Sequence, residues 1–322
     1  MSGQRAPEPG DSKTTSLDLA ARAGGTRVIC LGLSALDQIW RVPAFFSGGS
    51  QKIRSLHYAT MGGGMAATAA VTVARLGGQA AFWGRGGDDA AGHEMRKALS
   101  GQGVDAAQFR LFAEGHSSVS GVLVDDAGER QIVNFRGQFP EEAGWLPLGD
   151  VAAASSVLAD PRWPAGAVAL FEAARARAIP TILDAEVAEP DVFEALLPLT
   201  DHAIFSEPAL SGFAGSTGDA ALAGIAKFGC AVAAVTRGAD GVTWLQNGMS
   251  HRQPAYAVSA VDTTGAGDVF HGAYAFAIGA GLDAADAMSF AAAAAALKCT
   301  RPGGRAGIPT LEDCLAFQRN GS

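Results

Sequence analysis

The segment 261–268 constrains the fold more than any other part of the chain. It reads Val-Asp-Thr-Thr-Gly-Ala-Gly-Asp and is followed by mostly small and apolar residues, with no proline before Pro302. Because Gly265, Ala266 and Gly267 are small, their consecutive N–H groups can converge on one point. The helix predicted to begin here would direct the positive end of its dipole at the same point. This pattern indicates a turn that binds an oxyanion.

Asp268 directly follows this turn. A carboxylate repels an anion bound beside it, so the pair makes sense only if both take part in one reaction. In phosphoryl transfer, N–H groups stabilise the charge on the phosphoryl group while a carboxylate accepts the proton of the attacking hydroxyl. We therefore predict Asp268 as the catalytic base, with Gly265, Ala266 and Gly267 as the anion hole. The alternative is a glycine-rich helix start that binds nothing.

The order Asp-Thr-Thr, Gly-Ala-Gly and Asp268 resembles the signature of the ribokinase-like (PfkB-type) carbohydrate kinases. The resemblance implies an α/β fold: a ribokinase-like parallel-sheet sandwich with a small β-sheet lid. It implies ATP as cofactor, with Mg2+ bridging the phosphates, and leaves the identity of any metal ligands in the chain open. Many relatives also bind a monovalent cation such as K+ near the Asp-Thr-Thr stretch. Family members often pair through the lid, which predicts a homodimer.

Composition agrees with a packed enzyme. The chain has 322 residues, of which 48% are hydrophobic, 17% are charged and 42 are glycine. This length allows one large or two modest domains with a well-buried core, and the glycine content suits an α/β fold with many tight turns. The net charge is −8 and there is no basic cluster, so we expect no nucleic-acid partner.

Cysteine usage and hydropathy predict a cytoplasmic protein. The four cysteines lie far apart without a Cys-x-x-Cys pair, as is usual for reduced thiols. The first 25 residues lack the apolar core of a signal peptide. The longest apolar stretch, 284–297, is mostly alanine and contains Asp286, so we expect a core helix and no membrane partner.

The order of the expected elements supports the fold class. Residues 1–25 are polar and are predicted to be a disordered leader, followed by a ribokinase-like kinase domain at 26–322. The domain begins with a buried strand at 27–32. After Pro147, apolar strands alternate with helical stretches, as expected of a parallel sheet wrapped by helices. These strands are at 157–160, 181–184, 203–206 and 231–236, with further strands at 242–245 and 255–261.

Other β-like stretches do not fit this alternation. They lie at 38–43 and 51–60 and in a hairpin whose strands are 117–124 and 130–135. We predict that they form a second small sheet, a lid made of about 38–60 and 117–136.

Several residues are candidates for binding the sugar. Asp37 comes just past the expected end of the first strand, where open α/β sheets bind ligands. The run Gly62, Gly63 and Gly64 before a helix resembles the family's first signature, in which an asparagine follows four residues on. Thr68 takes that position here. The alternative for the glycine run is a helix-entry turn.

Two further segments resemble the family's nucleotide site. Thr236, Gly238 and Gly241 lie in a loop whose small residues let the backbone approach phosphate and ribose. Ser206 and Glu207 fall where the family has Asn-x-x-Glu, linked to the nucleotide and to magnesium-bound water. Because both ends of that motif differ here, the resemblance implies that magnesium handling is altered in detail.

Lys52, Asn134 and Arg162 are candidates for binding the tail of the substrate. Lys52 and Asn134 lie in expected lid strands, and Arg162 follows the strand at 156–160. Two positive charges and an amide suit an anionic sugar tail better than neutral hydroxyls. Singly, each could be a surface charge or a turn residue.

Within the family, the segments 158–163, 201–208 and 296–309 resemble the sulfofructose kinases of sulfoglycolysis. That resemblance implies transfer of the γ-phosphoryl group of ATP to the 1-hydroxyl of 6-deoxy-6-sulfofructose. It also implies that Lys52, Asn134 and Arg162 receive the sulfonate. A PfkB-type kinase for fructose, another ketose or a nucleoside is the first alternative. A non-catalytic sugar-binding regulator is the second, and retention of Asp268 argues against it.

Overall fold

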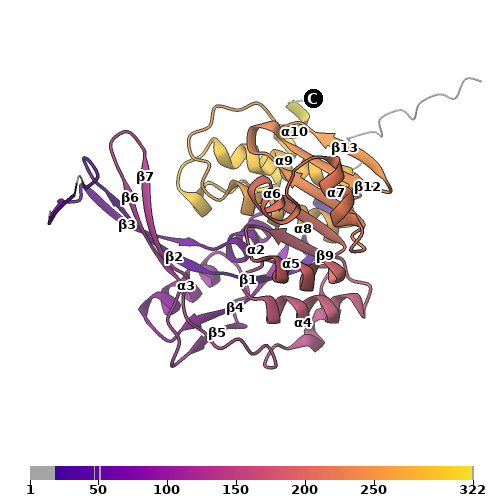
Figure 1. Ribbon diagram of the computed structural model, residues 1–322, viewed down its shortest axis with the longest axis horizontal. Helices are drawn as coiled ribbons and strands as arrows, with labels where there is room; N and C mark the ends of the chain where they lie inside the picture. Colours follow the sequence, from indigo (N-terminus) through magenta and orange to yellow (C-terminus); the bar gives the residue numbers. More distant parts are fainter. Residues whose placement is uncertain (1–18, 47, 51, 321–322) are drawn as a thin grey trace, which may run out of the picture.

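The computed structural model describes residues 19–46, 48–50 and 52–320 (Figure 1). Residues 19–25 are helical and end in the 3-10 helix η1 (Ala23–Gly25). Leu19 is 1% exposed and packs with Ala23 in the hydrophobic core. The predicted boundary between leader and domain at residue 25 is therefore too far along the chain, because Leu19 already packs in the folded domain. The first 18 residues of that leader lie outside the described residues.

A large sheet forms the centre of the molecule, in the order β13-β12-β11-β10-β9-β8-β1-β4-β5. All neighbours from β5 to β11 are parallel, and β12 and β13 extend one edge in antiparallel fashion. The strands are β1 (Arg27–Gly32), β4 (Gln79–Gly87), β5 (Phe109–Phe112), β8 (Ser156–Ala159), β9 (Thr181–Ala185), β10 (His202–Ser206), β11 (Val232–Thr236), β12 (Val242–Gln246) and β13 (Met249–Gln253).

Helices cover both faces of this sheet. In β1, Val28 and Cys30 belong to one core cluster while Ile29 and Leu31 belong to the other, because side chains alternate along a strand. The first face carries α2 (Met65–Arg75), α3 (Ala90–Gly101), α8 (Ala266–Gly279), α9 (Ala284–Cys299) and α10 (Leu311–Asn320). The second carries α4 (Pro164–Arg175), α5 (Pro190–Leu196), α6 (Glu207–Ala214) and α7 (Asp219–Ala226). No helix among the described residues is long and apolar enough to cross a membrane.

A separate four-stranded sheet projects from the side of the large domain (Figure 1), and we call it the lid. Its order is β3-β2-β6-β7, with β2 (Ala35–Arg41), β3 (His57–Gly63), β6 (Val119–Val124) and β7 (Arg130–Phe135). The outer pairs are antiparallel, whereas β2 and β6 are parallel. The predicted small sheet is confirmed, although β3 begins at His57 instead of residue 51 and continues to Gly63.

One local prediction fails near the antiparallel edge, and one helix beside β10 was not predicted. The segment 255–261 forms no strand, and β13 at Met249–Gln253 pairs with β12 instead. The turn between them is Asn247-Gly248, in which both residues have positive φ, 53° and 75°. This is the turn chemistry of a two-residue hairpin, and it sets the register of β13. Helix α6, which follows Ser206, was not expected.

Candidate active site

The predicted anion hole lies at the start of α8. Gly265 has φ 74° and precedes the first helical residue, Ala266, so the position requires the left-handed conformation that glycine adopts readily. The N–H of Ala266 donates to the carbonyl oxygen of Thr263 at 3.2 Å. The N–H groups of Gly265 and Gly267 donate to no backbone acceptor in the described chain, so they could bind an oxyanion. The helix dipole adds positive potential at this point.

Asp268 lies in the first turn of α8 beside Gly265. A Cβ on Gly265 would lie 3.7 Å from its Oδ2 atom. Asp268 is half-buried, and the protein packed around it displaces most of the water. This desolvation, reinforced by the carboxylates of Asp160 and Glu186, raises the pKa of Asp268 to about 6 against the opposing charge of Arg305. A carboxylate with that pKa is matched to proton transfer near neutral pH.

Two buried carboxylates missed by the sequence reasoning end neighbouring strands of the large sheet. Asp160 follows β8 and accepts N–H groups from Leu33 (2.8 Å), Ala66 (3.1 Å) and Arg162 (2.9 Å). Asp184 lies in β9, and its Oδ1 is 3.4 Å from Nδ1 of His271. Desolvation and the nearby carboxylate of Asp268 raise the pKa of Asp184 well above its usual range. Each of these aspartates lies at the carboxyl end of a parallel strand, where such sheets bind ligands, and this position could have identified both from the sequence.

The predicted sugar-binding residues lie together, though not as expected. Asp37 is inside β2 and does not follow β1, because the lid begins at Ala35. A Cβ atom added to Gly63 would lie only 2.6 Å from the Oδ2 atom of Asp37. Gly62 and Gly63 end β3, and Gly64 is the N-cap of α2. The glycine run therefore leaves room for neighbouring polar side chains.

An apolar cavity of about 540 Å³ opens beside the anion hole. It contains the predicted nucleotide residues Thr236, Gly238 and Gly241, and it reaches Ala266 and Gly267 at the start of α8. The segment 255–261, predicted as a strand, forms part of its wall. The other lining residues are Ala239, Val242, Ala255, Tyr256, Ala257, Val258, Ala260, Thr263, Phe270, Ala292, Ala295, Ala296 and Cys299. Such a cavity suits a planar base, with phosphates at the helix N-terminus.

Ser206 and Glu207 make contacts other than those expected. The Ser206 hydroxyl accepts the N–H of Ala209 (3.3 Å) as the cap of α6 and donates to Oε1 of Glu186 (3.0 Å). Glu207 accepts a hydrogen bond from Nε of Arg237 at 3.1 Å. Ser206 thus orients Glu186, a carboxylate the sequence reasoning missed, and Glu207 pairs with Arg237.

The three predicted tail-binding residues are not in contact within the described chain. Lys52 is exposed in the stretch before β3 and lies in no strand, since β3 begins five residues later. Asn134 lies in β7 as expected, and its amide donates to the hydroxyl of Ser120 at 3.1 Å. Arg162 lies at the carboxyl end of β8 and donates from its guanidinium to Val187 O at 2.7 Å.

The oxygen atoms of Asp262 do not fit a monovalent cation. The fully buried Lys298 donates from Nζ to the Asp262 carbonyl oxygen at 2.8 Å and lies 3.6 Å from Oδ2. The carboxylate also accepts N–H groups from Thr264, Gly303 and Gly304. An ammonium group thus sits against the oxygens that the Asp-Thr-Thr stretch would offer to K+.

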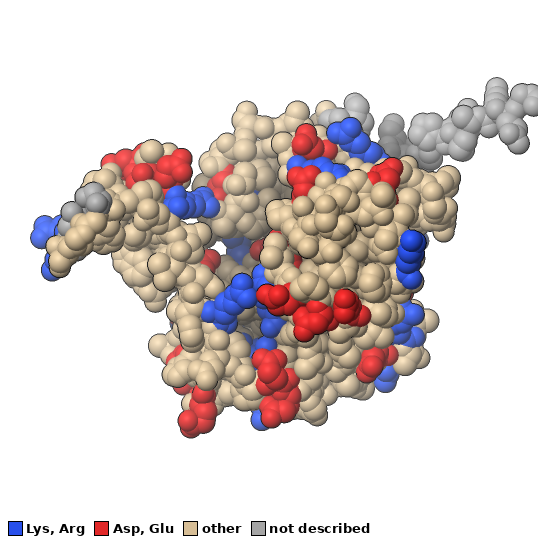
Figure 2. All heavy atoms as spheres, in the orientation of Figure 1, with Lys and Arg blue, Asp and Glu red and all other residues tan. Residues whose placement is uncertain are grey.

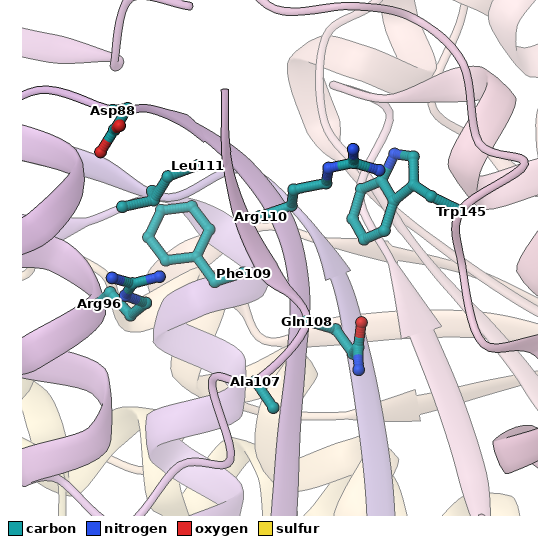
Figure 3. Close-up of a pocket in the computed structure, with 8 residues that line it drawn as sticks. All are labelled: Asp88, Arg96, Ala107, Gln108, Phe109, Arg110, Leu111 and Trp145. Atoms are coloured by element: carbon teal, nitrogen blue, oxygen red, sulfur yellow. The ribbon is translucent and has the colours of Figure 1, made fainter. Parts of the chain in front are cut away.

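The described residues form no metal centre, and a second cavity lies away from the predicted site. No group of three or more His, Cys, Asp or Glu side chains among them is arranged to hold a metal ion. A cavity of about 490 Å³ lies along the edge strand β5, where Arg110 stacks on Trp145 (Figure 3). Its lining includes none of the predicted site residues.

Known proteins match the chain over most of its length. Residues 25–311 match the pfkB family carbohydrate kinase. The ribokinase of Haemophilus influenzae is 26% identical over 297 residues, covering 89% of this chain and 96% of that protein. The fructokinase of Vibrio alginolyticus is 29% identical over 286 residues, covering 79% and 91% respectively.

Solved structures share the architecture. The structure of Arabidopsis thaliana ribokinase complexed with ribose and ATP gives a TM-score of 0.82 at 27% identity, covering 91% of this chain and 98% of that chain. The ribokinase of Thermotoga maritima gives 0.80 at 25% identity, covering 92% and 99%. The turn at the start of α8 and its neighbouring acid thus sit in a fold shared with sugar kinases, and the chain belongs to the pfkB family of carbohydrate kinases.

Proposed function

We propose that the protein transfers the γ-phosphoryl group of ATP to a primary hydroxyl of a sugar, with Asp268 as the base. The observation that carries this proposal is Asp268 itself, a carboxylate with pKa about 6 beside the anion-binding turn of Gly265. At pH 7 most of this carboxylate is ionised and can accept the proton of the attacking hydroxyl. The apolar cavity next to the turn has the volume and lining expected for adenosine.

The site residues have distinct roles in this mechanism. Asp37 is close enough to Asp268 to contribute to its raised pKa, and we assign both carboxylates to the sugar site. The N–H groups of Gly265 and Gly267 would stabilise the charge of the transferring phosphoryl group. Mg2+ bound with ATP would neutralise phosphate charge. The Glu186 carboxylate, which accepts a hydrogen bond from Ser206, would hold a water of the hydrated ion.

For the substrate we propose 6-deoxy-6-sulfofructose, phosphorylated at its 1-hydroxyl. Arg162 supports an anionic tail because it lies at the ligand edge of the sheet, where its charge partly offsets the desolvation that raises the pKa of Asp160. Figure 2 shows a hollow between the lid and the large domain, with Lys and Arg side chains on part of its wall. The proposal requires the lid to bring Lys52 and Asn134 toward Arg162 when the sugar binds.

The test is a screen of ADP release with 6-deoxy-6-sulfofructose, fructose, fructose 6-phosphate, ribose and adenosine. Arg162→Ala should lower kcat/KM for the sulfonated sugar far more than for fructose, because only the former loses an ion pair. Arg175→Ala is the matched control, since Arg175 lies on α4 and pairs with Asp201. An equal loss on both sugars would reject the sulfonate and leave a neutral ketose, as in the fructokinase relatives. Sugar binding without turnover by the wild type would favour a regulator.

We also propose a cytoplasmic homodimer. Large apolar side chains are exposed on the lid, with Tyr58 on β3 and Ile132, Val133 and Phe135 on β7. A second copy of the lid would bury them. The mass in solution measured by light scattering should correspond to two chains, and Val133→Lys should reduce it to one.

A further inference from the structure

Arg305 carries a buried guanidinium nitrogen with no acceptor among the described residues. It lies in the 3-10 helix η5 (Gly304–Gly307) and is 6% exposed. Its Nε donates to Thr68 Oγ1 at 3.1 Å and its Nη2 donates to Gly63 O at 2.6 Å. Nη1 is buried without a partner. Because an unpaired buried donor on a charged group is costly, its presence points to an acceptor supplied by a ligand.

The chain is built to hold this guanidinium in place. A Cβ at Gly62 would lie 2.3 Å from Nη1, so only glycine leaves the space that Arg305 occupies. Thr68 stands where the family signature has asparagine, and its hydroxyl accepts from Nε. Gly62, Gly63 and Thr68 therefore form a binding site for the side chain of Arg305, which comes from the C-terminal part of the chain.

The residues that hold Arg305 lie next to both Asp268, the proposed base, and Asp37, the carboxylate proposed to bind the sugar. A Cβ on Gly265 would lie 3.7 Å from Thr68 Cγ2 and equally far from Asp268 Oδ2, which places Thr68 against the anion hole. Asp37 lies over Gly63, the residue whose carbonyl accepts from Nη2. Asp37 and Asp268 both act electrostatically on Arg305, yet neither forms an ion pair with it within 4 Å in the described chain.

We propose that Nη1 of Arg305 donates a hydrogen bond to an oxygen of the bound sugar, beside the hydroxyl that attacks ATP. Arg305 is then a catalytic residue that contacts the substrate, and this assignment rests on the proposed function. Its charge has a second effect, since the guanidinium lowers the pKa of Asp268 and so favours the ionised base. Burial lowers the pKa of Arg305 itself only to about 10, so it stays charged at neutral pH.

Three variants separate these effects. Arg305→Met should raise the sugar KM by about 10- to 100-fold because a charged donor to the substrate is lost. It should leave the ATP KM nearly unchanged and move the acid limb of kcat/KM to higher pH. Arg305→Lys should keep the acid limb in place while the sugar KM still rises. Arg301→Met is the control, since Arg301 lies four residues earlier and pairs with Asp313.

Calorimetry without ATP gives a readout that does not depend on turnover. 6-Deoxy-6-sulfofructose and fructose are titrated into each variant, and circular dichroism checks that the variants are folded. Weaker sugar binding in both Arg305 variants than in Arg301→Met supports the proposal. Unchanged binding and an unchanged acid limb in Arg305→Met would overturn it. Wild-type protein that binds a sugar but releases no ADP would defeat the proposed function alone, and calorimetry would still decide the role of Arg305.

Discussion

The Asp268→Asn variant should lose activity and gain stability. In the native protein the pKa of Asp268 is raised from 3.8 to about 6, so its ionised form is less favourable folded than unfolded. Each pKa unit corresponds to about 1.4 kcal/mol, so above pH 6 the ionised carboxylate lowers the free energy of unfolding by about 3 kcal/mol. The penalty shrinks to about 1.6 kcal/mol at pH 5 and vanishes well below pH 3.8, where both states are protonated. Asparagine cannot ionise and should escape this penalty.

Urea unfolding of the wild type and of Asp268→Asn at pH 7.5 and pH 5 measures this difference. The variant should be the more stable protein at both pH values, with the larger gain at pH 7.5, while kcat falls by about 10²- to 10⁴-fold. Asp313→Asn is a control of opposite sign, because the hydrogen bond from Arg301 helps hold the pKa of Asp313 at about 2 and its carboxylate stabilises the fold. An Asp268→Asn protein that is less stable at pH 7.5, or whose gain does not change with pH, would refute the reasoning.

Four further outcomes follow from the site. The acid limb of kcat/KM in the wild type should have its midpoint near pH 6, where Asp268 protonates, and a limb near pH 4 would exclude this group as the base. Activity should be the same in K+ and tetramethylammonium salts because the ammonium group of Lys298 already contacts the oxygens of Asp262. Lys298→Met should lower the free energy of unfolding by about 3–5 kcal/mol in urea titration, because it leaves Asp262 without its buried partner. Gly62→Ala should raise the sugar KM but not the ATP KM, since the added Cβ displaces Arg305, and equal changes in both constants would contradict this.

Local pattern predicted the main elements because each has a short-range cause. The run at β1 is apolar throughout since both its faces are buried, and the alternation after Pro147 follows from parallel strands joined by helices. The glycine turn at the start of α8 was predictable for the same reason, because it depends on consecutive small residues, whereas the sequence did not show that the N–H of Ala266 bonds to Thr263. The strand at 255–261 was wrong because its apolar residues line a cavity and pair with no strand. A β pattern cannot distinguish these two kinds of burial.

The rest of the site depends on contacts between distant segments. Arg305 meets Thr68 across 237 positions of the sequence, and Lys298 meets Asp262 across 36. No local signal identifies either pair, so the sequence reasoning assigned the glycine run directly to the sugar. Asp160 and Asp184 were predictable in principle from their place at strand ends. The contact of Ser206 with Glu186 was not, since it required knowing that β9 and β10 are neighbours.

Asp160 connects three segments that are distant in the sequence. Its carboxylate accepts the backbone N–H groups of Leu33 after β1, Ala66 at the start of α2 and Arg162 after β8. These segments therefore share one hydrogen-bond acceptor, so a shift of one segment would disturb the bonds to the other two. Re-engineering specificity at one loop alone would transmit the change to its two companions, so successful redesign has to treat them as a single unit.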